Sequence, residues 1–201
     1  MNSYYFDEYI DLLERVLSFA HQNLYSFGYV ESRIVNNDFF KSLEKSDEGY
    51  SPIITDNELI KELFPDSKMN LEDVPLYNQC LWAAESYLKI QEETSLTFEA
   101  IFLYIPLDEM YNYFPIYHEM DFSQIVSRFK ELYLLDSVLQ KLIDRSGFTI
   151  CDISNKTNIN KDTLYSLKDR RRDIKNASVL LVSTLANLFK VRVETIAELK
   201  Q

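Results

Sequence analysis

Residues 148–168, FTICDISNKTNINKDTLYSLK, have the spacing of two short helices joined by a tight turn. Thr149 can cap the first helix at its N-terminus, with Asp152 three residues later accepting a hydrogen bond from the backbone of the cap. Asn158 occupies the turn, where asparagine tolerates the left-handed conformation better than most residues do. Asn160 can cap the second helix. The stretch therefore predicts a helix-turn-helix unit.

The apolar residues of this stretch are spaced so that the two helices pack together. Ile150 and Ile153 are expected to point inward from the first helix, and Ser154 supplies the small residue that a close helix crossing requires. Leu164 and Leu167, three residues apart, anchor the second helix to the core. The residues left on its outer face are Lys161, Asp162, Tyr165 and Ser166.

On these residues the chain resembles the Cro/C1-type (XRE) helix-turn-helix family. The resemblance covers about a third of the chain, from Leu139 to a closing segment at 191–196. It implies a five-helix, lambda-repressor-like domain over residues 134–201 that binds double-stranded DNA. The chain departs from the family in two places, since Asn158 replaces the glycine of the turn and no glycine follows the second helix within 168–172.

The resemblance also implies a mode of DNA contact, in which the second helix enters the major groove with its N-terminus first. Lys161 and Ser166 would contact base edges, with Lys161 donating to guanine O6 or N7, and Asp162 could accept from cytosine N4. Phosphate contacts set the register rather than the sequence. The residues expected at phosphates are Asn160, Tyr165, Arg170, Arg171, Arg172 and Lys175.

The charge of the chain is divided unevenly along its length. Residues 134–201 hold 12 Lys and Arg against 8 Asp and Glu, whereas residues 1–133 hold 9 against 24. Affinity for duplex DNA comes largely from Lys and Arg that displace condensed counterions. A basic segment joined to an acidic one is therefore consistent with DNA binding by residues 134–201 alone. The alternative is a degenerate helical module that serves only in protein interaction or dimerisation.

Composition favours helices throughout the 201 residues. Hydrophobic residues make up 46 % of the chain, which is sufficient for a core, and the 3 Gly and 5 Pro are too few for a turn-rich β-sandwich. We therefore expect an all-α fold, with an acidic helical domain over residues 1–133. The expected helices cover 5–24 (ended by Gly28), 30–43, the segment between a capping box at 55–58 and Pro65, 73–91, 97–104, 106–114 (stopped by Pro115) and 121 or 123 to 135.

The junction between the two predicted domains is expected at 132–136, where no flexible linker occurs, so they share a continuous helix or pack closely. Cys80 and Cys151 lie in apolar runs without a second cysteine or histidine nearby, and we expect buried free thiols. The N-terminus has no basic region, and no apolar run approaches the ~18 residues of a membrane span. We therefore expect a soluble, cytoplasmic protein.

Few residues suggest catalysis. Arg15 and His21 have a spacing that resembles the motif of HEPN ribonucleases, but six positions apart they lie on different faces of a regular helix. His118 and Glu119 lie near Asp121 without the second histidine of a metal site, and a locally hydrogen-bonded turn is the preferred interpretation. With three glycines the chain has no phosphate-binding glycine loop. We expect no enzymatic activity, no metal and no cofactor.

The sequence thus leaves two functional hypotheses. The first is a transcriptional regulator of bacterial or mobile-element type, acting as an autorepressor and binding DNA as a homodimer, because operator affinity normally comes from two half-sites. The second is an antitoxin-like protein whose acidic domain neutralises a partner protein. Residues 1–133 carry no chemical motif, but the segments 81–87, 107–114 and 117–121 are loosely similar to helical domains in regulators of mobile elements and toxin–antitoxin loci.

Overall fold

The structure is a computed structural model that describes residues 6–44, 54–67 and 74–197. Across these residues it contains thirteen α-helices and no β-strand, so the all-α prediction is confirmed. The helices that precede Asp136, which we call the N-terminal part, are α1 (Phe6–Gln22), α2 (Phe27–Asn36), α3 (Asp38–Glu44), α4 (Asp56–Leu63), α5 (Asn78–Thr94), α6 (Phe98–Tyr104), α7 (Leu107–Tyr117) and α8 (Ser123–Leu135).

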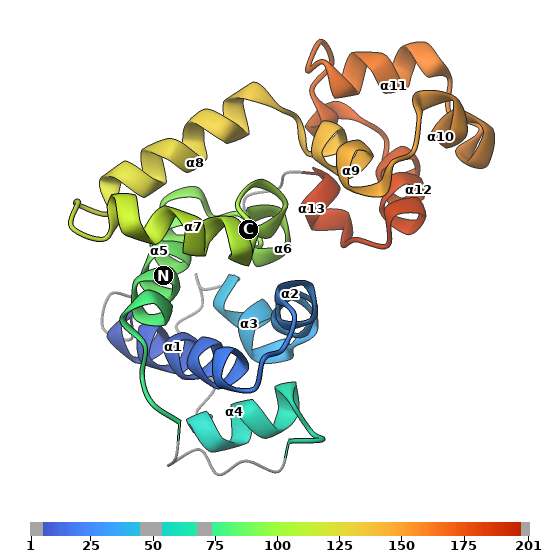
Figure 1. Ribbon diagram of the computed structural model, residues 1–201. Coiled ribbons are helices and arrows are strands. Elements are labelled where there is room, and N and C mark those ends of the chain that lie inside the picture. The colour runs from blue at the N-terminus through green and yellow to red at the C-terminus, as the bar shows by residue number, and fades with distance from the viewer. Residues whose placement is uncertain (1–5, 45–53, 68–73, 198–201) are drawn as a thin grey trace.

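The remaining helices form a separate cluster, which we call the C-terminal part, and α8 connects it to the rest of the molecule (Figure 1). Asp136 is extended between α8 and the next helix, so no continuous helix crosses this junction. The helices of the C-terminal part are α9 (Val138–Ser146), α10 (Ile150–Thr157), α11 (Lys161–Lys168), the 3-10 helix η3 (Ile174–Asn176), α12 (Val179–Phe189) and α13 (Val193–Ala197).

The aromatic residues of the N-terminal part lie mainly in its core, where α1 packs along α5. Phe19, Phe98 and Phe129 are fully buried and contribute to the apolar area removed from water. Tyr87 and Tyr104 are also buried, and their hydroxyls donate to the carbonyls of Ile105 and Asp136 at 3.0 and 2.9 Å. These polar groups therefore remain hydrogen-bonded inside the core.

Three predicted helix boundaries are wrong. Gly28 does not end the first helix but lies in the first turn of α2, because Leu24 adopts the left-handed conformation (φ 56°) directly after α1. The helix expected over 30–43 is two helices, because Asn37 is extended and its side chain accepts from the N–H of Phe39 at 2.9 Å. The helix expected over 73–91 begins at Asn78, while residue 73 lies outside the described residues.

The expected stop at Pro115 is also wrong, because α7 continues through this proline to Tyr117. A proline has no N–H to donate to the carbonyl four residues earlier, here that of Tyr111. Gln79 on α5 donates its side-chain amide to this carbonyl at 3.0 Å. A neighbouring helix thus replaces the missing hydrogen bond, and α7 tolerates the proline.

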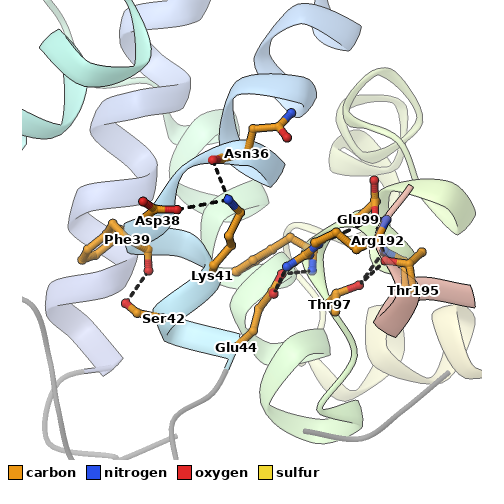
Figure 2. Close-up of polar contacts among 12 residues, drawn as sticks. Asn36, Asp38, Phe39, Lys41, Ser42, Glu44, Thr97, Glu99, Arg192 and Thr195 are labelled. Carbon is orange, nitrogen blue, oxygen red and sulfur yellow. Dashed lines mark hydrogen bonds and ion pairs between the residues drawn. The ribbon is translucent and has the colours of Figure 1, made fainter. Parts of the chain in front are cut away.

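The N-terminal part is joined to the C-terminal part through the buried carboxylate of Glu44 and the half-buried carboxylate of Glu99. Glu44 on α3 forms a bidentate ion pair with Arg192, just before α13, at 2.6 and 2.9 Å (Figure 2). Glu99 on α6 accepts from the backbone N–H of Arg192 at 2.8 Å and from the hydroxyl of Thr195 at 2.6 Å. Thr97 completes the contact by a hydrogen bond to Thr195. Arg192 and the helix α13 that follows it are therefore fixed against α3 and α6.

None of the helices that the structure describes combines the length and the apolar composition of a bilayer-spanning segment.

Candidate nucleic-acid interface

Helix α10 begins at the capping box that the sequence predicts. The Thr149 hydroxyl accepts from the N–H of Asp152 at 3.1 Å, and the Asp152 carboxylate accepts from the N–H of Thr149 at 2.9 Å. A further hydrogen bond joins the two side chains at 2.6 Å. These bonds to Thr149 favour the ionised carboxylate and lower the pKa of Asp152. The start of the helix-turn-helix unit is therefore fixed by local interactions.

The turn between α10 and α11 also has the predicted geometry. Asn158 is left-handed with φ 58°, and its N–H donates to the carbonyl of Ser154 at 2.8 Å. The Ser154 hydroxyl reaches across the turn and donates to the carbonyl of Ile159 at 2.7 Å, a bond that spacing alone did not indicate. Asn160 caps α11 by accepting from the N–H of Asp162 at 2.7 Å. Both predicted asparagine roles are thus confirmed.

Helix α11 is anchored by one face and exposed on the other. Leu164 and Leu167 are buried together with Ile150 and Ile153 of α10, as the spacing predicts. The opposite face carries three exposed candidate residues and one half-buried serine, whose hydroxyl donates back to the carbonyl of Asp162 at 2.7 Å. The hydroxyl proton of this serine is therefore already used within the helix. The four residues are Lys161, Asp162, Tyr165 and Ser166.

Arg170, in the loop after α11, adopts the left-handed conformation with φ 53°. Its guanidinium donates to the carbonyl of Asp136 at 2.8 Å and lies over the Tyr133 ring, 4.9 Å from the centroid. Arg170 thus joins the loop after α11 to the end of α8. Tyr133 and Asp136 lie in the junction expected at 132–136, but the sequence does not relate them to Arg170, because both precede it by more than thirty residues and match no motif.

The other cations of this loop, which we call the basic loop (residues 169–175), are exposed. Arg171 forms an ion pair with Asp169 at 3.1 Å. Arg172 and Lys175, like Lys161 on α11, have no ion pair within the described part of the chain. These three cations are free to bind an anion without first breaking an ion pair.

Helix α11 lies at the outer edge of the molecule, away from α1–α7 (Figure 1). The end of α8 adjoins the basic loop, where Tyr133 packs against Arg170, whereas the contacts of α3 and α6 with the C-terminal part are at α9 and α13. The carboxylates of Glu44 and Glu99 are used in these contacts, remote from the exposed face of α11. A long polyanion could therefore approach α11 and the basic loop without displacing the N-terminal part.

The residues considered for catalysis are not assembled into a site. Arg15 lies 4.0 Å from Asp56, whereas the His21 ring packs edge-on against Tyr77, with centroids 4.7 Å apart. His118 is exposed, and its Nδ1 lies 2.8 Å from the carbonyl of Phe114. Over the described residues, no group of three or more His, Cys, Asp and Glu side chains is arranged to hold a metal ion.

The prediction for the cysteines is half correct. Cys80 is a buried free thiol, and its sulfur lies 3.4 Å from the Tyr111 hydroxyl. Burial raises the pKa of this thiol. Cys151 is exposed on the first turn of α10, because the inward positions there are those of Ile150 and Ile153.

Comparisons of the chain with protein-family models, with curated proteins and with solved structures found no match.

Proposed function

We propose that this protein is a sequence-specific DNA-binding transcriptional regulator that acts in the cytoplasm and represses its own operator. The observation that carries the proposal is the exposed face of α11 and the basic loop, where Lys161, Arg172 and Lys175 have no anionic partner among the described residues. The face belongs to a bihelical unit with capped helices and a left-handed asparagine in its turn. A net basic segment in an otherwise acidic chain adds support.

We assign a role to five of the candidate residues. Lys161 and Asp162 lie at the N-terminus of α11, from which side chains reach base edges when a helix enters the major groove N-terminus first. Arg172 and Lys175 are assigned to phosphates. Arg170 is assigned to positioning the basic loop, because its guanidinium is bound to Asp136.

The proposal includes a homodimer. One helix-turn-helix unit offers few base contacts, and specific affinity normally comes from two half-sites about 34 Å apart on the duplex. We therefore expect a two-fold symmetric operator. Sedimentation with and without operator DNA measures this state directly.

The experiment that tests the proposal selects duplexes from a random-sequence pool with the full-length chain and then titrates the selected sequence against a shuffled one. We expect the selected duplex to bind at least about 1,000-fold more tightly at physiological salt. Lys161→Ala should relax the preference at one base pair, whereas Lys61→Ala, the same charge change on α4, should leave it unaltered. Equal binding of both duplexes by the native protein would refute the proposal.

A further inference from the structure

A cavity of about 340 Å³ lies between the N-terminal and C-terminal parts, which is within the usual size of small-molecule sites. Helices α2 and α6 form one side, and α9 and the end of α12 form the other. A second cavity adjoins it and shares Gly28, Glu31, Phe102, Leu103 and Arg145 with the first. A molecule bound here would contact both parts of the protein at once.

The carboxylates around the first cavity are already bound to protein groups. Glu31 accepts from the N–H of Leu107 at 2.8 Å and lies 3.5 Å from the Arg145 guanidinium. Glu99 accepts from Arg192 and Thr195 in the contact described above. The acidic lining therefore has little remaining capacity to hold a cation.

The two cationic side chains of the same cavity can still bind an anion. The Arg145 side chain is 59 % exposed and has a single ion pair, to Glu31, whose side chain is 7 % exposed. Lys190 is exposed at the end of α12 and has no ion pair within the described residues. The rest of the lining is mixed, with Ser32, Asn36 and Ser146 beside six apolar residues. The apolar lining residues are Val35, Phe102, Leu103, Leu142, Phe189 and Val191.

Gly28 is exposed and lines both cavities. It lies in the first turn of α2 with an ordinary helical φ, and a Cβ atom placed on it would meet no atom within 4 Å. Neither the backbone nor a neighbouring side chain requires a glycine here, and glycine weakens a helix relative to alanine. The lack of a side chain at Gly28 leaves open space where the two cavities meet.

We propose that this cavity binds a small organic anion with an apolar body, such as a medium-chain carboxylate, whose charged group pairs with Arg145 and Lys190. The apolar body lies against Phe102, Leu142 and Phe189. Binding bridges the N-terminal and C-terminal parts. This proposal does not depend on the proposed function, because binding of the anion can be measured in the absence of DNA.

The first test uses isothermal titration calorimetry of the full chain with octanoate as probe and octan-1-ol as neutral control. We expect saturable binding of octanoate and no saturable binding of the alcohol. Lys190→Asn should weaken octanoate binding on the order of tenfold, the effect of losing one charge-assisted hydrogen bond. Lys190 has φ 57°, a conformation that asparagine also adopts readily, so this variant keeps the helix end intact.

The second test fills the cavity at Gly28. Gly28→Leu should abolish octanoate binding, whereas the control Gly28→Ala should retain it, because both favour the helix but only leucine occupies the open space. Circular dichroism and thermal melting check that both variants fold. The proposal would be overturned if the native protein showed no saturable octanoate binding. It would also be overturned if Gly28→Leu, Gly28→Ala and Lys190→Asn all bound octanoate with the same affinity.

Discussion

At the scale of single residues, Pro115 illustrates how a local rule is overridden by one long-range hydrogen bond. The proline lies inside α7, and the carbonyl of Tyr111 that it leaves without a helical donor accepts from the Gln79 side chain. The sequence indicates the missing donor, since proline has no N–H. It does not indicate the replacement, because nothing in the spacing of Gln79 and Tyr111 relates α5 to α7.

We predict that Gln79→Ala lowers the free energy of unfolding by about 1–3 kcal/mol, because it leaves the partly buried carbonyl of Tyr111 unsatisfied. In a Pro115→Ala background, alanine restores the helical N–H and the same change should cost much less. Urea unfolding of the four proteins gives the coupling free energy. A coupling of zero would show that Gln79 does not replace the proline's hydrogen bond.

At the scale of elements, the structure agrees with the sequence where the signal is contained in a few neighbouring residues. The capping boxes at Thr55 and Thr149 and the left-handed Asn158 each depend on side chains within four positions. The break at Asn37 was missed because the apolar periodicity continues across it, with Ile34 and Phe39 both buried. Helical periodicity alone does not mark where one helix ends and another begins.

The capping box of α10 predicts a dependence of stability on pH. The Thr149 hydroxyl and N–H lower the pKa of Asp152, so the folded state favours its ionised form. This stabilisation is present above about pH 4, the ordinary range of an aspartate, and is lost as the pH falls through the lowered folded-state value. In Asp152→Asn, stability at pH 7 should fall, and the further loss between pH 5 and pH 2.5 should be smaller than in the native protein.

Thr149→Ala provides the matched variant, since it removes the hydroxyl that binds Asp152 and should cost about 1 kcal/mol at pH 7. Its loss of stability on acidification should also be smaller than that of the native protein. Unfolding in urea at the three pH values measures both effects. Parallel pH profiles for the native protein and the two variants would contradict the assignment.

At the scale of the whole molecule, part of the acidic surplus of the N-terminal part is used within the chain itself. Glu31, Glu44 and Glu99 all bind groups of the C-terminal part. The sequence shows the charge imbalance but not this use of it, because Glu44 and Arg192 are 148 positions apart. The sequence alone suggests only that the acidic residues neutralise a partner protein.

We predict that Arg192→Met weakens this contact strongly. The Glu44 side chain is 2 % exposed, and removing one partner of a buried ion pair typically costs about 3–5 kcal/mol. The control Arg171→Met, at an exposed arginine of the basic loop, should change stability little. Adding Glu44→Gln to Arg192→Met should recover part of the loss. Urea unfolding and limited proteolysis measure these differences, and equal stabilities of the two methionine variants would contradict the prediction.

The contact of Glu44 and Glu99 with Arg192 and α13 also affects which surface of the C-terminal part is accessible to DNA. It holds α3 and α6 beside α13, on the side of the C-terminal part away from α11 (Figure 1). We propose that the exposed face of α11 and the basic loop bind duplex DNA. Because each phosphate contact releases counterions, the dependence of affinity on salt reports the number of such contacts.

The most direct measurement is therefore the slope of log Kd against log salt concentration for the full chain on its selected duplex, compared with Arg172→Ala and Lys61→Ala. We predict weaker binding at higher salt for the native protein, a slope smaller by about one for Arg172→Ala, and an unchanged slope for Lys61→Ala on α4. A native affinity that does not depend on salt, or the same slope for all three proteins, would contradict DNA binding by this face.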